Sequence, residues 1–226
     1  MRNAEFKLDE EEALDLLEEI KKKLKRRQWG EAIRLEVEER TNPSLLGFLK
    51  DQLEVDDEDV FRIKGPLDLT VLMKIYALEG FDNLRAKKHT PVTNVRLIDC
   101  EDIFASIREK DILLSHPYES FDPVIDFVSK AACDKNVLAI KQTLYRVSGN
   151  SPIIKALANA ADNGKQVTVL VELKARFDEE NNINWARMLE KAGCHVIYGL
   201  VGLKTHSKIT LVVKREKDFL YDNPSK

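Results

Sequence analysis

The stretch from residue 137 to residue 198 alternates apolar strand-like segments with helix-like ones, and this alternation constrains the fold more than any other feature. Strands are predicted over 137–146, 167–176 and 195–198, and helices over 152–163 and 183–192. Gly164 and Gly193 follow the two helices, where glycine commonly ends a helix. Strands and helices in this order are typical of parallel βαβ units, so we predict an α/β fold.

Polar side chains recur at the ends of the predicted strands. Arg146 and Arg176 lie at the ends of two strands at a spacing of thirty residues, and His206 follows after a further thirty. Ligands of open α/β sheets bind beyond the carboxyl ends of the strands. One βαβ period has about this length, so we expect the three side chains to converge on one edge of the sheet.

Residues 202–208 (Gly-Leu-Lys-Thr-His-Ser-Lys) run into an apolar segment, and we predict a strand over 206–213. Side chains alternate along a strand, so His206 and Lys208 are expected on one face, together with Lys204 if the strand begins that early. An imidazole beside a fixed ammonium suits nucleophilic attack on a phosphorus centre. The alternative is a surface histidine at a strand edge.

The two arginines also have two interpretations. Guanidinium groups match the geometry of phosphate oxygens, so Arg146 and Arg176 are candidate phosphate ligands. Alternatively they are ordinary loop residues, with Arg176 paired to an acidic residue of the segment 178–180. That acidic segment is itself interpreted as an exposed helix start in preference to a Mg²⁺ ligand set. The sequence contains neither a P-loop nor a Gly-x-Gly-x-x-Gly motif.

The first part of the chain has a different organisation. Helices are predicted over 9–28, 43–53 and 67–78, and strands over 32–38 and 60–63. This order indicates a small α+β unit, followed by a junction rich in turn-forming and basic residues over 80–98. Short helices are predicted after it, over 102–108 and 122–133.

Charge and cysteine content limit the class of ligand and the cellular compartment. The net charge of the 226 residues is −3, but acidic side chains prevail in residues 1–60 and basic ones in 137–208. The half with His206 is therefore suited to an anionic ligand. Three widely spaced cysteines match neither a metal site nor a disulfide framework. We find no apolar run of membrane-spanning length and no signal peptide, and we expect a cytoplasmic protein.

Five longer strings closely resemble the polyphosphate kinase family, the ATP-dependent polymerising type. They are Arg62–Thr70, His116–Pro123, Ala139–Arg146, Val171–Asn182 and Gly202–Lys208. The resemblance covers nearly the whole chain. It implies an incomplete phospholipase-D-like βαβ sheet preceded by a small α+β domain. Residues 1–92 resemble part of the family's head (middle) domain, and residues 93–226 resemble the front of its first C-terminal catalytic domain.

The resemblance also implies an activity and roles for individual residues. The activity is reversible transfer of the ATP γ-phosphate to inorganic polyphosphate, with Mg²⁺ as cofactor and a phosphohistidine at His206. Arg146 and Arg176 match the family's Mg²⁺–phosphate site. Arginine has no lone pair for a metal, so both are interpreted as phosphate clamps. Lys208 is expected to support the phosphohistidine, and Lys204 to bind phosphate.

The sequence departs from related patterns at two places. Phospholipase-D enzymes carry an aspartate where this chain has Val213. Complete family members are also much longer, so we expect a chain that lacks the second half of the site and is poorly active alone. The complete enzyme is expected to be a homo-oligomer that binds ATP, ADP and polyphosphate but no nucleic acid. Two alternatives are a non-catalytic polyphosphate- or nucleotide-binding fragment and, less favoured, a dimeric phospholipase-D-like phosphodiesterase.

Overall fold

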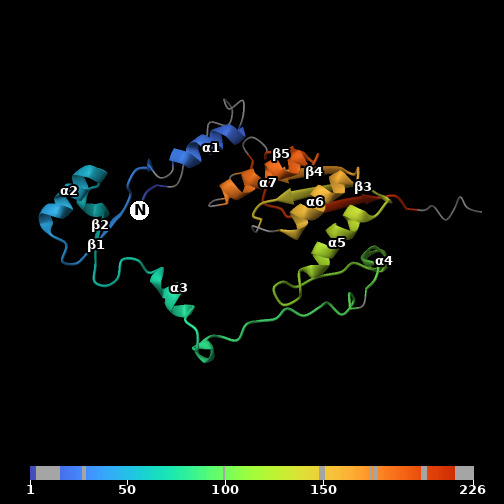
Figure 1. Cartoon of the computed structure of the whole chain (residues 1–226), viewed down its shortest axis with the longest axis horizontal. Coiled ribbons are helices and arrows are strands. Elements are labelled where there is room, and N and C mark those ends of the chain that lie inside the picture. Colours follow the sequence, from blue (N-terminus) through green and yellow to red (C-terminus); the bar gives the residue numbers. More distant parts are fainter. Residues whose placement is uncertain are drawn as a thin grey trace, which may run out of the picture. The chain divides into compact units, whose positions relative to one another are not determined.

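The computed structural model divides the chain into two compact units. The residues that it describes are 1–3, 16–26, 29–98, 100–147, 151–173, 175, 178–199 and 203–216. The first unit comprises Met1–Asp9 and Glu18–Lys88, and the second comprises Glu10–Leu17 and His89–Lys226. Figure 1 shows the elements of both along the chain. The boundary predicted after residue 92 stays a prediction, as do the domain assignments.

The first unit is built around a parallel pair of short strands, β1 (Leu35–Glu38) and β2 (Val60–Ile63), in the register Leu35 to Val60. Helix α2 (Pro43–Leu53) and the short helix η2 (Asp57–Asp59) connect them, and α3 (Val71–Tyr76) and η3 (Asp82–Leu84) follow. Helix α2 has the predicted bounds. Its first turn is capped by the Asn42 side chain, which accepts a hydrogen bond from the Ser44 amide at 2.8 Å. Strand β1 and helix α3 are shorter than the predicted segments.

Helix α1 (Leu16–Arg26) forms part of the predicted helix over 9–28, of which residues 9–15 and 27–28 lie outside the described residues. Leu17 and Ile20 on this helix are buried. They belong to the apolar repeat from which the helix was predicted.

The second unit contains a four-stranded sheet in the order β5–β4–β3–β6. Its strands are β3 (Val137–Leu144), β4 (Gln166–Val171), β5 (His195–Ile197) and β6 (Thr210–Lys214). Strands β3, β4 and β5 are parallel, as predicted, and β6 pairs antiparallel with β3. The helices are α4 (Ile103–Glu109), α5 (Asp122–Cys133), α6 (Pro152–Asp162) and α7 (Glu179–Lys191).

The core of this unit lies between the sheet and its helices. Figure 1 shows α5, α6 and α7 alongside the sheet, where they contact β3, β4 and β5 respectively. Fully or almost fully buried side chains on both layers include Val128, Ile140, Ile154, Leu157, Val169 and Leu189. Gly164 and Gly193 follow α6 and α7 with φ of 77° and 88°, a conformation that favours glycine. These features confirm the predicted α/β class.

Three predicted boundaries in this unit are clearly wrong, and the first is the end of β4, which lies at Val171 and not at residue 176. The strand predicted over 206–213 begins only at Thr210, so His206 and Lys208 lie in the preceding loop and not on one face of a strand. Helix α7 begins at Glu179 and not at residue 183. The acidic segment 178–180 lies at this earlier start, but it is not an exposed cluster throughout, because Glu179 is 4% exposed whereas Glu180 is exposed.

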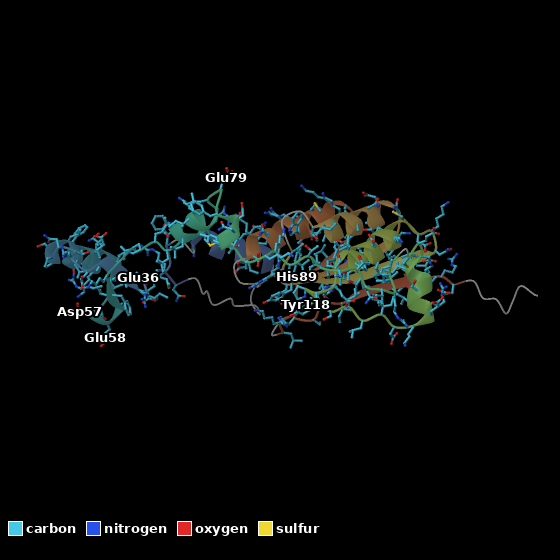
Figure 2. The ribbon with its side chains drawn as sticks, turned by 90° about the horizontal axis from the view of Figure 1, so that it is seen from below. Glu36, Asp57, Glu58, Glu79, His89 and Tyr118 are labelled. Carbon is cyan, nitrogen blue, oxygen red and sulfur yellow. The ribbon has the colours of Figure 1, made fainter. Side chains whose placement is uncertain are left out.

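Two further observations concern the chain outside the sheet. No helix formed by the described residues is both long and apolar enough to cross a membrane. At the start of the second unit the rings of His89 and Tyr118 meet edge to face, with centroids 5.8 Å apart (Figure 2). Both rings belong to the second unit.

One ion pair ties the sheet edge to the end of α5, and it predicts a pH-dependent stability. Lys214 Nζ lies 2.7 Å from Asp134 Oδ2, and both side chains are about four-fifths buried. Hydrogen bonds from the Lys214 ammonium and from the Asn136 amide hold the pKa of Asp134 below its usual value. We expect Asp134→Asn to lower the free energy of unfolding by ~1 kcal/mol at pH 7.

The sign of this pH dependence follows from the lowered pKa. The stabilisation is present above the unfolded pKa of an aspartate, about 3.9, and is lost as the pH falls through the folded value. Urea unfolding of both proteins between pH 7 and pH 3 measures the difference, which should shrink in acid. The exposed Asp126 serves as the control through Asp126→Asn. A difference that is independent of pH contradicts the assignment.

The three cysteines are free, and they differ in burial. Cys194 is buried, and desolvation together with the charge of Asp162 raises the pKa of its thiol to about 11. We therefore expect a thiol reagent at pH 8 to modify the exposed Cys133 first and Cys194 only after unfolding. Peptide mapping of the modified chain checks this order, and early modification of Cys194 in the native chain contradicts it.

Candidate active site

Four of the candidate side chains lie around the ring of Tyr145, the residue that directly follows strand β3. The imidazole of His206 meets it edge to face, with ring centroids 5.1 Å apart and planes at 80°. Three cations surround the same ring: Lys208 Nζ is 4.4 Å from its centroid, Arg146 Cζ 5.7 Å and Lys204 Nζ 5.9 Å. Each of the four side chains is exposed to solvent. The structure thus brings an imidazole and three positive charges to one point.

The loop that carries His206 is held by strand β3. The hydroxyl of Thr143 donates to the carbonyl oxygen of Ser207 at 2.7 Å and accepts from the Ile209 amide at 2.8 Å. The Thr143 amide donates to the carbonyl oxygen of Ile209 at 2.9 Å. The loop therefore runs along the end of β3 before it becomes β6, which places His206 beside Tyr145.

Lys208 reaches this place differently from the expected strand geometry. Its ammonium donates a hydrogen bond to the carbonyl oxygen of His206 and lies against the Tyr145 ring. His206 and Lys208 are therefore close together because the loop folds around the Tyr145 ring. The expected alternation of side chains on a strand is absent, because β6 begins after both residues.

Arg146 forms an ion pair at the rim of the site. Its Nε lies 3.0 Å from Asp178 Oδ2, and its side chain is 55% exposed. Solvent screens such a pair, so it contributes little to stability and can exchange for a phosphate oxygen. An acidic residue of the segment 178–180 is the partner that one interpretation of the sequence gives to Arg176. The structure pairs Asp178 with Arg146 instead, and Arg176 lies outside the described residues.

A pocket of about 560 Å³ opens beside this cluster. Tyr145, Arg146 and Lys208 contribute to its wall, which also contains apolar side chains of α5, β3 and α6. The other lining residues are Phe121, Val124, Gln142, Thr143, Leu144, Val147, Ser151, Ile153 and Thr210. The cations therefore border a partly apolar hollow at the carboxyl end of β3, where open α/β sheets bind ligands.

Metal-binding side chains do not gather in the part of the chain that the structure describes. There, no group of three or more histidine, cysteine, aspartate or glutamate side chains is arranged to hold a metal ion. Arg146, Lys204 and Lys208 are donors without a lone pair for a metal. The described site therefore offers charge for an anion and no ligand set for a cation.

Two residues of this region, Tyr145 and Glu172, are part of the site without being candidates from the sequence. The ring of Tyr145 contacts His206, a contact that nothing in the sequence indicates. Glu172 was not singled out. Its side chain is 1% exposed, and Oε2 accepts a hydrogen bond from the Thr205 amide at 2.7 Å. A lone carboxylate directly after the apolar run Val167–Val171 was the available signal, because it sits where parallel strands present functional side chains.

Comparison with known proteins gives consistent matches over both units. Residues 102–222 match the family model described as polyphosphate kinase C-terminal domain 1, and residues 1–75 match the polyphosphate kinase middle domain. A polyphosphate kinase of Halalkalibacterium halodurans is 59% identical over 220 residues, which are 96% of this chain and 31% of the relative. One of Streptomyces coelicolor is 49% identical over 224 residues, 97% of this chain and 30% of the relative.

A solved structure extends the similarity to the fold. The crystal structure of polyphosphate kinase from Porphyromonas gingivalis superposes with a TM-score of 0.69 at 30% sequence identity. It covers 82% of this chain and 28% of that protein. The predicted phospholipase-D-like α/β fold is thereby confirmed. The chain spans about a third of the length of the relatives that it matches.

Proposed function

This chain belongs to the polyphosphate kinase family, and we propose that it carries the phosphoryl-accepting histidine of such an enzyme, His206. The observation that supports this role is the contact of His206 with Tyr145, around which Arg146, Lys204 and Lys208 also gather. The substrates of the proposed reaction are ATP and inorganic polyphosphate. Both are polyanions that suit a site of exposed cations.

In the first step, the neutral imidazole of His206 attacks the γ-phosphorus of ATP in line with the leaving group. A nitrogen–phosphorus bond forms, and the bond from the γ-phosphorus to the bridging oxygen breaks and releases ADP. Arg146, Lys204 and Lys208 offset the negative charge on the transferred oxygens, which is the main contribution of a protein to phosphoryl transfer.

In the second step, a terminal phosphate oxygen of polyphosphate attacks the phosphohistidine. An oxygen–phosphorus bond forms, the nitrogen–phosphorus bond breaks, and His206 returns to its neutral state. The overall reaction is reversible, because it breaks one phosphoanhydride bond in ATP and forms another in polyphosphate. We propose Arg176 as a further phosphate clamp, on the resemblance alone.

Mg²⁺ enters this proposal as part of the substrate MgATP. The described side chains around Tyr145 do not make a site for a metal held by the protein, because Arg146, Lys204 and Lys208 are cations without a lone pair and His206 alone is not a ligand set. Mg²⁺ prefers water and phosphate oxygens, which the nucleotide itself supplies. The role of Arg146 is therefore to bind phosphate oxygens next to the ion.

A phosphodiesterase is the weaker alternative. Such an enzyme of the phospholipase-D type needs the aspartate that Val213 replaces, and Val213 lies in β6 paired with Ala139. A non-catalytic polyphosphate-binding role uses the same cations without the chemistry of His206. It differs from the proposal only in whether phosphate becomes covalently attached.

Labelled ATP tests the proposal. The purified chain is incubated with Mg²⁺ and either γ-labelled or α-labelled ATP, and then chased with polyphosphate. We expect acid-labile, base-stable label from the γ-position only, and its release onto polyphosphate in the chase. Label from the α-position contradicts phosphoryl transfer. Absence of label, with polyphosphate still bound at low salt, contradicts catalysis and favours the binding role.

A further inference from the structure

His206 lies between two residues whose backbones are held by the sheet. On one side, the Thr205 amide donates a hydrogen bond of 2.7 Å to the Glu172 carboxylate. On the other side, the carbonyl oxygen of Ser207 accepts a hydrogen bond of 2.7 Å from the Thr143 hydroxyl. The imidazole between these two anchors is the group that meets Tyr145.

The two anchors come from neighbouring strands whose ends are tied together. Thr143 lies in β3, and Glu172 follows β4 directly. The Asn182 amide group on α7 donates to the carbonyl oxygens of Tyr145 and Glu172, at 2.7 and 2.9 Å. The Glu172 amide also donates to the carbonyl oxygen of Leu144 at 2.9 Å. Loop, strand ends and helix therefore form one connected hydrogen-bond network.

Burial of this polar network costs free energy, which argues that the network has a structural or functional use. Glu172 and Asn182 are each 1% exposed, and a buried carboxylate needs hydrogen bonds to offset its desolvation. Apolar residues at these positions could fill the same space. What they could not do is accept the hydrogen bond of a particular loop amide, that of the residue before His206.

We propose that Glu172 and Thr143 are positioning residues for His206: they fix the backbone on both sides of the imidazole and so hold it against Tyr145, in line for phosphoryl transfer. This inference rests on the proposed function in so far as it concerns catalysis. Neither residue touches the reacting atoms. Displacement of a reacting group by about 1 Å can cost about a hundredfold in rate, so the anchors act on the rate through geometry.

Removal of an anchor residue should slow phosphoryl transfer to His206 without weakening the binding of MgATP. Removal of an anchor leaves Arg146, Lys204 and Lys208 in the chain, so MgATP still binds. We expect Thr143→Val and Glu172→Leu each to lower the single-turnover labelling rate at saturating MgATP at least tenfold. The half-saturating MgATP concentration should change less than threefold. Glu172→Gln keeps an oxygen acceptor for the Thr205 amide and should stay within about threefold of the unchanged chain.

Matched controls use the same substitutions elsewhere. Thr168→Val changes a half-buried threonine of β4, and Glu180→Gln changes an exposed glutamate of α7. Both should label at the unchanged rate. Labelling by the Thr143→Val chain at the rate of the Thr168→Val chain overturns the proposal, and so does an equal loss in the Glu172→Gln and Glu172→Leu chains.

NMR of the same chains gives a readout that does not depend on catalysis. The Tyr145 ring shifts the resonances of the His206 ring protons, because the two rings are in contact. We expect this shift to disappear in Thr143→Val and to persist in Thr168→Val, with native circular dichroism in both. Persistence of the shift in Thr143→Val overturns the positioning role. If the unchanged chain accepts no label, the proposed function fails, while the NMR comparison still decides the positioning.

Discussion

Replacement of His206 by glutamine is expected to reduce phosphoryl transfer from γ-labelled ATP to the chain by at least a hundredfold. Glutamine has a similar size and can donate and accept hydrogen bonds, but its amide nitrogen is not a nucleophile. The His206 side chain is exposed, so the substitution should leave the stability nearly unchanged. The measurement is the initial rate of label incorporation, with thermal unfolding as a check of the fold.

The matched control for this variant is His195→Gln. His195 is also an exposed histidine of the second unit, but it lies on the edge strand β5. We expect full labelling of that variant. Retained labelling in His206→Gln, or an equal loss in both variants, contradicts the role assigned to His206.

Arg146 is expected to show the second large effect, on the affinity for polyphosphate. Hydrogen bonds to charged groups contribute ~1.5–3 kcal/mol each, so Arg146→Gln should weaken polyphosphate binding at least tenfold. The variant should also reduce the dependence of binding on salt, because one cationic contact is lost. Binding of fluorescently labelled polyphosphate at several ionic strengths measures both quantities.

The ion pair of Arg146 predicts an opposite effect for its partner. Asp178 Oδ2 lies 3.0 Å from Arg146 Nε and competes with a phosphate for the guanidinium group. An exposed pair of this kind contributes about 0.2–1 kcal/mol, so Asp178→Asn should tighten polyphosphate binding by a factor of about 1.4 to 5. Glu180→Gln removes the same charge nearby and is the control. Equal tightening in both variants indicates a general charge effect and contradicts a specific competition.

Local sequence signals predicted the elements whose ends depend on local chemistry. Helix α5 has the predicted bounds, with Pro123 in its first turn, and α2 begins at the predicted Pro43. The three parallel strands were visible as short apolar runs, and β3 and β4 supply most of the buried strand residues. The order of these elements was enough to predict the α/β class and the sheet edge at which side chains gather.

Tertiary contacts determined what local signals did not show. Strand β6 begins where Thr210 pairs with Gln142, and Thr143 holds the preceding loop with side-chain hydrogen bonds. An apolar run cannot reveal such a partner. The first turn of α7 was missed for a related reason. Glu179 and Asn182 are polar and buried, so the apolar repeat begins a turn too late.

The candidate site, too, was predicted only in part from local sequence signals, and the rest depends on tertiary contacts. The spacing of Arg146 and His206 predicted that they meet, and both contact Tyr145. The loop geometry that brings them together, and the buried carboxylate of Glu172 behind it, depend on contacts between residues far apart in the sequence. Arg176 lies outside the described residues, and its role stays a prediction.

The central claim is that phosphate from ATP becomes bonded to His206, and identification of the phosphorylated residue tests it most directly. The chain is incubated with MgATP, digested at alkaline pH and analysed by peptide mass spectrometry, which preserves a phosphohistidine. We predict a single phosphate on the peptide with His206, assigned to its imidazole by fragmentation. Phosphate on any other residue, or on none while MgATP is bound, contradicts the account.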